Sequence, residues 1–401
     1  MPDSQRNPRS AVRSVRHNPA DRPFLVIWEA TRACALACVH CRAEAMTDRD
    51  PRELSTEEAT ELMAQVRSFG SPPPIFVITG GDPFERPDLF DLVRRGRDLG
   101  LPVAVSPSGT EKLNHTSLTE LHKAGATAIS LSVDGATAAV HDGFRQVGGT
   151  FQRTLDAWQT AQQVGLKVQV NTTLGTHNLD QLPDLIALVS RWQAMTWSIF
   201  LLVPMGRGSD LDTLTPQVVE DVLNLLYDAG DRIPIKTTEG HHFRRVAIQR
   251  QILAKTGEDP VATLGLGPTY RRLSAELAAL ALPVTRSRRP PLHVNAGNGF
   301  AFVSHTGSVH PSGFLPVAAG NVRDQSLTDI YRKSELFTSL RDPSGLAGRC
   351  GQCEFGRVCG GSRSRAYATG GDTLGDDPLC GYLPGSFGHR EEVALAVGGR
   401  G

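Results

Sequence analysis

The chain has 401 residues, of which 40% are hydrophobic and 21% charged, and this length supports a large core and more than one domain. Its 42 Lys and Arg balance 42 Asp and Glu, so net charge gives no reason to expect nucleic acid or an acidic membrane as a partner. No apolar run approaches the roughly 18 to 20 residues that a membrane span needs. Residues 1–20 lack the apolar centre of a secretory signal and are expected to form a disordered basic tail of a cytoplasmic protein.

Short apolar segments then alternate with amphipathic ones. Residues 24–30 (FLVIWEA) and 75–81 (IFVITGG) are typical of buried strands, and residues 55–70 between them predict a capped helix. The alternation continues to Glu239 and predicts six or seven parallel strands. We therefore expect an α/β protein whose residues 21–240 form a partial (βα)6 barrel of the TIM type.

Distinctive sequences follow the predicted strands. The first strand is followed by TRACALACVHC, the second by GGDP, the fourth by SVDG, the fifth by NTT and the sixth by VPMGRG. In parallel barrels the chemistry lies at the C-terminal ends of the strands. The sequence therefore predicts a functional site at that end of the barrel.

The regular alternation ends after Glu239. Residues 241–295 contain one possible helix, FRRVAIQRQILAKTG, and a basic, Pro-rich stretch, and are expected to be an insertion or linker. Residues 296–384 contain a hairpin-like pair and four cysteines, and predict a C-terminal Cys-rich domain. Residues 385–401 are expected to be a loose tail.

Three of the seven cysteines, Cys34, Cys38 and Cys41, lie within eight positions. Cysteines at such short spacing in a reducing compartment favour a metal site over disulfides. A closed zinc site needs four ligands, and His40 would have to be the fourth. The alternative is a cubane iron–sulfur cluster on three thiolates, which leaves one iron open to another ligand. The spacing favours the cluster.

The other four cysteines, Cys350, Cys353, Cys359 and Cys380, are spaced C-x2-C-x5-C-x20-C. Four thiolates can close an iron–sulfur cluster completely, which suits electron transfer or structural support. The same four ligands also suit zinc. Both alternatives remain open at this site.

The C-x3-C-x2-C loop after the first strand resembles the signature of the radical S-adenosylmethionine (radical SAM) enzymes. In that family the three cysteines hold the catalytic cluster, which binds S-adenosylmethionine and splits it reductively to a 5′-deoxyadenosyl radical. GGDP resembles the family's GGEP-type motif, which receives the methionine amino group. The resemblance also implies contacts with S-adenosylmethionine for a wider set of residues: His40, Gly80, Gly81, Asp82, Pro83, Ser132, Arg145 and Asn171.

The C-terminal cysteines resemble the SPASM/twitch subgroup, in which seven cysteines serve two auxiliary clusters. This chain has Ser312 and the stretch GGSR (360–363) where further cysteines are expected. The resemblance therefore implies one auxiliary [4Fe-4S] cluster, and two [4Fe-4S] clusters in all. It also implies a flavodoxin or ferredoxin as electron donor.

The substrate is the least determined part. Arg207, Glu239, His242, Arg244 and Arg245 are candidates for the barrel mouth, where arginines can clamp carboxylates. The whole pattern resembles the haem-biosynthesis branch, whose members act on propionate side chains of tetrapyrroles. A peptide-maturing radical SAM enzyme and a zinc-stapled binding module without catalysis are the alternatives.

Overall fold

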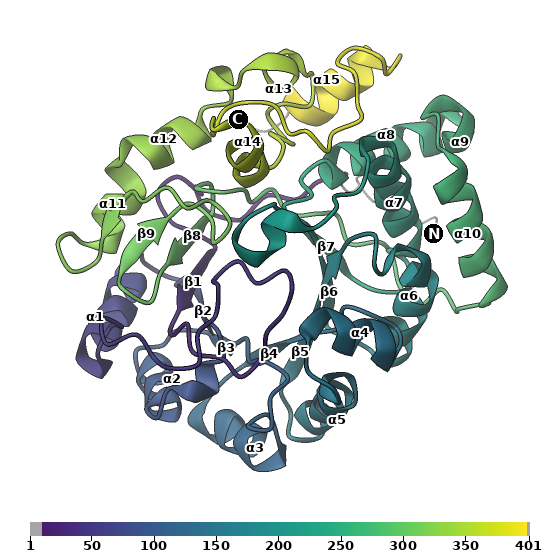
Figure 1. Ribbon diagram of the computed structural model, residues 1–401. Coiled ribbons are helices and arrows are strands. Elements are labelled where there is room, and N and C mark those ends of the chain that lie inside the picture. The colour runs from purple at the N-terminus through teal and green to yellow at the C-terminus, as the bar shows by residue number, and fades with distance from the viewer. Residues whose placement is uncertain (1–9, 399–401) are drawn as a thin grey trace, which may run out of the picture.

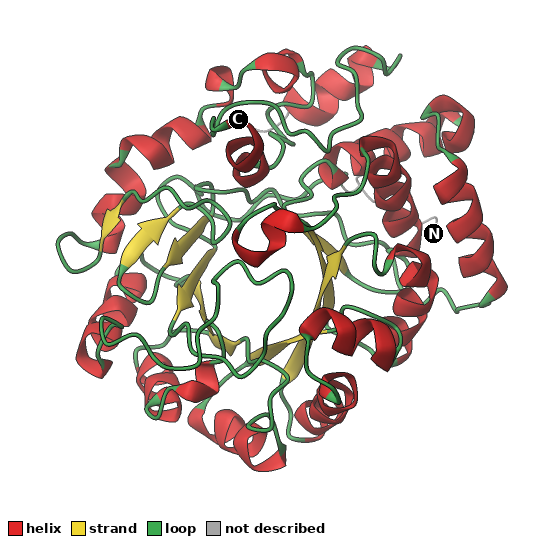
Figure 2. Ribbon diagram, in the orientation of Figure 1, coloured by secondary structure: helices red, strands yellow, loops and turns green. Residues whose placement is uncertain are grey.

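The computed structural model describes residues 10–398. Residues 1–9 of the expected basic tail and residues 399–401 of the expected C-terminal tail lie outside the described residues. A ring of strands surrounds the centre, and helices cover its outer face (Figure 1, Figure 2). No helix in residues 10–398 has the length and apolarity needed to cross a membrane.

The ring is one ten-stranded sheet with the order β10-β9-β8-β1-β2-β3-β4-β5-β6-β7. Strands β1 to β7 are parallel and lie beside their sequence neighbours, as in a TIM-type barrel. This confirms the predicted α/β partial barrel, with a seventh parallel strand beyond the (βα)6 unit. The strands are β1 (Leu25–Glu29), β2 (Ile75–Thr79), β3 (Val103–Val105), β4 (Ala128–Ser132), β5 (Lys167–Leu174), β6 (Thr196–Leu201), β7 (Ile235–Thr238), β8 (Phe300–Val303), β9 (Ser308–His310) and β10 (Gly320–Asn321).

Strand side chains alternate between the helices and the barrel interior. In β2, Phe76 and Ile78 are fully buried on the helix side, whereas Ile75, Val77 and Thr79 line the interior cavity. The apolar strands therefore supply both the core under the helices and much of the wall of the cavity.

The helices bury one apolar stripe each. Helix α1 starts with a capping box at Ser55 and buries Ala59, Leu62, Met63 and Val66, the i, i+3, i+4, i+7 spacing of a core-facing helix. The helices are α1 (Thr56–Arg67), α2 (Leu89–Asp98), α3 (His115–Ala124), α4 (Ala138–Arg145), α5 (Thr150–Gln163), α6 (Leu182–Arg191), α7 (Pro216–Ala229), α8 (Phe243–Thr256), α9 (Pro260–Thr263), α10 (Pro268–Ala279), α11 (Leu327–Lys333), α12 (Glu335–Arg341), α13 (Gly348–Gln352), α14 (Arg363–Gly370) and α15 (Arg390–Gly398), with 3-10 turns η1 (Pro83–Glu85), η2 (Leu179–Gln181), η3 (Gly206–Asp210) and η4 (Pro343–Gly345).

The C-terminal part is joined directly to the barrel sheet. Strand β8 pairs in parallel with β1, and β9 and β10 continue the sheet as antiparallel neighbours. The hairpin expected in the Cys-rich region is thus an extension of the barrel wall. Residues 241–295, expected as a linker, hold three helices, and α8 is buried over most of its length.

Val12 anchors residues 10–20, a segment for which the sequence led us to expect a disordered tail. Val12 is fully buried in a second, smaller core, where it lies with Ile248 of α8, Val393 of α15 and Phe355 from the segment of the second cysteine group. The apolar partners of Val12 come from three segments that are distant in the sequence, and burial against them stabilises the N-terminal segment. The composition of this Arg-rich stretch does not predict these contacts. The segment around Val12 is therefore part of the folded body.

Two irregular segments run across the gap between β7 and β8. Arg13 donates its backbone N–H to the carbonyl of Pro291 at 2.9 Å, and His293 donates to the carbonyl of Arg13 at 2.8 Å. Figure 1 shows the purple N-terminal segment beside the green segment that leads to β8. Arg13, Pro291 and Leu292 line the interior cavity, so these segments complete the wall where the sheet does not close.

We expect Val12→Ala to destabilise the protein by about 1–3 kcal/mol, because it removes two fully buried methyl groups. Val284, which is 65% exposed, gives the matched control: Val284→Ala should change stability by less than about 0.5 kcal/mol. The measurement is the thermal unfolding midpoint of the two variants, followed by circular dichroism beside the parent protein. Equal midpoints for the two variants would contradict a packed N-terminal segment.

Candidate functional site

A cavity of about 650 Å³ occupies the barrel interior and is lined by residues from each of the strands β1 to β8. Its volume lies within the range of about 300–1,000 Å³ that small-molecule sites span. The cavity brings together most of the residues that the sequence predicted for one site. Those that line it are Cys34, Cys38, His40, Cys41, Gly80, Gly81, Ser132, Arg145, Asn171, Arg207, Glu239 and Arg244.

The start of GGDP holds the cysteine loop by its backbone. Gly81 donates its N–H to the carbonyl of Thr31 at 2.7 Å, and Asp82 donates to the carbonyl of Ala33 at 2.7 Å. A Cβ on Gly81 would collide with the Ala33 carbonyl oxygen, and one on Gly80 would collide with the Thr31 carbonyl oxygen. Only residues without a side chain permit this approach. The motif therefore positions the start of the loop that carries the three cysteines.

Asp82 and Pro83 do not line the cavity. The fully buried carboxylate of Asp82 accepts hydrogen bonds from the Thr110 hydroxyl at 2.6 Å and from the Phe84 N–H at 3.2 Å. Burial raises the pKa of Asp82 above its ordinary value, and the hydrogen bond from Thr110 opposes that shift. Pro83 opens the 3-10 turn that Asp82 caps. Both residues shape the turn, and the part of the motif that meets the cavity is its glycine pair.

Polar groups lie close to two sulfurs of the first cysteine group, and those of Leu36 and Arg145 are hydrogen-bond donors. Cys34 Sγ lies 3.5 Å from the hydroxyl oxygen of Ser108 and 3.4 Å from the Leu36 nitrogen, and Cys38 Sγ lies 3.6 Å from Arg145 Nη1. Burial raises the pKa of Cys34 as a free thiol. Donors to ligand sulfurs stabilise negative charge on a cluster and raise its reduction potential.

Arg145 is held by a buried carboxylate. Its Nε lies 2.8 Å from Oδ2 of Asp134, which is fully buried and also accepts the Thr173 N–H at 2.7 Å. Burial works against both charges, but the Asp134 carboxylate raises the pKa of Arg145 and the Arg145 cation lowers the pKa of Asp134. Arg145 is therefore a fixed cation at the cavity wall beside Cys38.

His40 belongs to a stack of three rings. Its ring lies 4.3 Å from that of Phe144, and Phe144 lies 3.8 Å from His177, both nearly parallel. Burial, reinforced by the nearby Arg145 cation, lowers the pKa of His40 to about 3. The imidazole is thus neutral at physiological pH. Phe144, which orients it, is a residue for which the sequence gave no signal.

Ser132 and Asn171 are direct neighbours in the sheet. They face each other in the register of β4 and β5, and both line the cavity. The Asn171 side-chain oxygen accepts a hydrogen bond from Gln169 at 2.8 Å. Both residues lie in the C-terminal halves of their strands, toward the end of the barrel where the sequence predicted the functional site.

The cavity wall is strongly cationic although the whole chain is neutral. The described residues that line it include eight Lys or Arg side chains and two carboxylates, Asp134 and Glu239. Arg207 lies in η3, and its backbone N–H donates to the Cys41 carbonyl at 3.1 Å. Within the described residues, the buried Nε and Nη2 of its side chain have no hydrogen-bond partner. Arg244, by contrast, donates to the carbonyls of Val358 and Val294 at 2.7 and 2.8 Å.

Glu239 joins the barrel to the C-terminal region. It directly follows β7, and its Oε1 accepts hydrogen bonds from the hydroxyls of Ser312 and Ser364, both at 2.9 Å. Ser362 donates to Oε2, and Arg365 donates to the Glu239 carbonyl at 2.6 Å. Ser312 and Ser362 belong to the two places where the sequence has serine rather than cysteine. At both positions the serine hydroxyl donates a hydrogen bond to the buried carboxylate of Glu239.

The other predicted mouth residues lie away from the cavity. His242 is fully buried, and its Nε2 lies 3.1 Å from Oδ2 of Asp377. Arg245 pairs with Glu220 and stacks over Tyr382 at 4.7 Å. Arg245 lines the cavity of the second cysteine group, and His242 contacts Asp377, which lines the same cavity.

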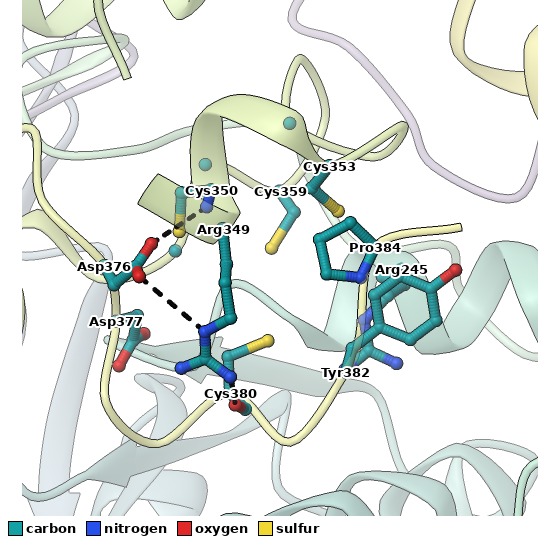
Figure 3. A pocket seen from close by; sticks show the side chains of 13 residues that line it. Arg245, Arg349, Cys350, Cys353, Cys359, Asp376, Asp377, Cys380, Tyr382 and Pro384 are labelled. Atoms are coloured by element: carbon teal, nitrogen blue, oxygen red, sulfur yellow. Dashed lines mark hydrogen bonds and ion pairs between the residues drawn. The ribbon is translucent and has the colours of Figure 1, made fainter. Parts of the chain in front are cut away.

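Cys350, Cys353, Cys359 and Cys380 surround a small cavity of about 30 Å³ (Figure 3). Arg245 and Arg349 also line it. Burial raises the pKa of Cys353 to about 11 and that of Cys359 to about 12, so these thiols stay protonated until a metal centre displaces the proton.

Both cysteine groups have the donor set of an iron–sulfur cluster. Within residues 10–398, no three His, Cys, Asp or Glu side chains converge closely enough to hold a single metal ion. A cubane places its cysteine ligands on different iron atoms, so its ligands need not meet at one point.

Comparison with known proteins gives the family. A profile of the radical SAM superfamily matches residues 28–189. The chain is 38% identical to the AdoMet-dependent heme synthase of Methanosarcina barkeri over 90% of this chain and 97% of that protein. It is 39% identical to the heme synthase of Oleidesulfovibrio alaskensis over 92% and 89%. The chain belongs to the radical SAM superfamily.

More distant relatives agree with this placement. The Fe-coproporphyrin III synthase of Methanosarcina barkeri is 30% identical over 92% of this chain and 91% of that protein. The solved structure of anSMEcpe with bound AdoMet shares the fold at a TM-score of 0.64 and 15% identity, covering 94% of this chain and 97% of that chain. The chain is therefore a radical SAM enzyme of the SPASM type, related to AdoMet-dependent heme synthases, and the alternative of a zinc-stapled binding module is wrong.

We expect Gly81→Ala to reduce S-adenosylmethionine cleavage by about 10²-fold, because its Cβ would push the cysteine loop out of place. Gly148 has no atom within 4 Å of an added Cβ, so Gly148→Ala should behave like the parent protein. Iron content and 5′-deoxyadenosine formation are measured for both variants. Parent-like cleavage by Gly81→Ala would refute the positioning role of this glycine.

Proposed function

We propose that this enzyme acts in haem biosynthesis and abstracts hydrogen from a propionate side chain of a tetrapyrrole. The observation that carries the proposal is the cationic cavity wall, whose two carboxylates are already bonded to Arg145 and to serines. A substrate with several carboxylates supplies the negative charge that this wall lacks. The identity to heme synthases and to an Fe-coproporphyrin III synthase supports the same substrate class.

Cys34, Cys38 and Cys41 would hold the [4Fe-4S] cluster that radical SAM enzymes use. When bound, that cluster supplies an open iron for S-adenosylmethionine and the electron that splits it. The glycine pair of GGDP offers backbone groups to the methionyl end, and the rest of the nucleotide would be surrounded by His40, Ser132, Arg145 and Asn171. The apolar interior faces of β1 and β2 keep water from the reacting atoms.

Cys350, Cys353, Cys359 and Cys380 would hold one auxiliary [4Fe-4S] cluster. The small cavity between the four thiols supports this cluster, and residues 10–398 hold no further cysteines beyond the two groups for another one. A closed cluster here would exchange electrons with the reaction chamber. We further propose a flavodoxin or ferredoxin as reductant, in the cytoplasm, where thiols stay reduced.

Single replacement of Cys34, Cys38 or Cys41 by Ala should abolish formation of 5′-deoxyadenosine by the dithionite-reduced enzyme, because each removes one ligand of the catalytic cluster. Ala35→Ser, at an exposed position of the same loop, is the matched control and should retain cleavage. Retained cleavage by any of the three cysteine variants would remove that residue from the catalytic site.

The auxiliary site is tested by metal analysis. The parent protein, purified without oxygen, should hold about eight iron per chain, and the variant lacking Cys34, Cys38 and Cys41 about four. Zinc in place of iron in that variant would show that the second cysteine group is a zinc site.

The substrate is tested by isotope transfer. Iron coproporphyrin deuterated on its propionate side chains should pass deuterium into 5′-deoxyadenosine when mixed with enzyme, S-adenosylmethionine and reductant. A peptide-maturing enzyme would leave the 5′-deoxyadenosine unlabelled. The latter result would overturn the tetrapyrrole assignment while leaving the radical SAM assignment intact.

A further inference from the structure

Lys236 carries an ammonium group on the inner wall of the barrel. It is the second residue of β7, and it lines the cavity. Its side chain is exposed and faces the cavity, and desolvation by the surrounding protein lowers its pKa. Within the described residues, the side chain has no hydrogen bond or ion pair.

Within residues 10–398, the ammonium of Lys236 has no carboxylate partner on the cavity wall. A cation that faces a cavity without a counter-charge attracts an anionic group that enters it. The two carboxylates on the same wall are committed elsewhere: Asp134 to Arg145, and Glu239 to three serine hydroxyls. No side chain of the described residues therefore neutralises Lys236. Packing alone would not explain the charge, because only the methylene groups of a lysine contribute to packing.

The sheet register places Lys236 on the same hydrogen-bonded rung as two residues of the predicted nucleotide site. Ser132 pairs with Asn171, Asn171 with Ser198, and Ser198 with Lys236. These four residues form one continuous rung from β4 to β7. Lys236 lies three strands from Ser132, roughly 14 Å along the wall at about 4.8 Å per strand. That separation leaves room for a substrate side chain between the nucleotide and the ammonium.

We propose that Lys236 binds a carboxylate of the substrate and thereby turns the neighbouring carbon toward the nucleotide. The inference rests on the proposed function, since it requires a substrate with carboxylate side chains. An ammonium is a compact point charge that suits a single carboxylate oxygen. Arg207 also lines this cavity, and within the described part of the chain its buried Nε and Nη2 have no hydrogen-bond partner. It offers a second anchor for the substrate.

The test compares Lys236→Met and Lys236→Arg with the parent enzyme, all purified as holoenzyme without oxygen. The probe is iron coproporphyrin, titrated by absorbance. Lys236→Met keeps most of the length of the side chain and removes the charge, and should weaken binding by about 10- to 100-fold. Lys236→Arg restores the charge and should recover most of the affinity. Lys333→Met, on the exposed end of α11, is the matched surface control and should bind as the parent does.

A second readout separates anchoring from a structural role. With propionate-deuterated probe at saturation, the fraction of 5′-deoxyadenosine that carries deuterium should fall in Lys236→Met, because the carbon is no longer held in place. A purely structural role would not be rescued by Lys236→Arg.

The outcomes are distinct. If the parent binds the probe and Lys236→Met binds it equally well with the same deuterium fraction, the role of Lys236 is overturned and the proposed function stands. If Lys236→Met and Lys236→Arg both lose binding equally, charge recognition is overturned. If the parent does not bind the probe, the tetrapyrrole function fails, and the inference about Lys236 fails with it.

Discussion

The buried carboxylate of Glu239 couples the two parts of this enzyme. It follows β7 directly, with a positive φ of 54° that is rare for a residue with a side chain. Its hydrogen-bond donors, Ser312, Ser362 and Ser364, all come from the C-terminal region. A buried carboxylate is tolerated only when it is bonded. The C-terminal region must therefore dock in one register, and a shifted arrangement would leave this charge unsatisfied.

The same network reaches the second cysteine group. Ser362 donates its N–H to Asp377 at 2.8 Å, Arg365 pairs with Asp377 at 2.9 Å, and the Cys380 N–H donates to the Asp377 carbonyl at 3.1 Å. Burial opposes the charge on Asp377, but the Arg365 cation lowers its pKa well below the ordinary value. A continuous set of polar contacts thus fixes the cysteine centre relative to the reaction chamber, as electron exchange between them would require.

The sequence predicted what local patterns determine. Alternating strands and helices, the capping box at Ser55 and the spacing of Cys34, Cys38 and Cys41 are all short-range features, and the barrel and its loop follow from them. Long-range partners were not accessible in this way. Arg245 was a mouth candidate by its position, but the direction of α8 turns it toward Glu220 and Tyr382.

Lys236 and Phe144 differ in whether a sequence pattern could have indicated their positions. Lys236 interrupts an apolar strand, IPIKTT, with a charge on the interior face, which strand alternation alone could have flagged. Phe144, by contrast, stacks with His40 from a helix more than 100 positions away, and no local pattern announces such a contact. The burial of Val12 has the same origin, since its partners come from α8, α15 and the segment of the second cysteine group.

The gap between β7 and β8 has a mechanical consequence. Around the rest of the ring, neighbouring strands are joined by ladders of backbone hydrogen bonds, whereas Arg13 and Leu292 meet in an isolated bridge. Two backbone hydrogen bonds join the segments at this flank, whereas β5 and β6 are paired over six residues. At this flank the wall is therefore held less by backbone pairing and more by side-chain packing, such as that of Val12 in the second core.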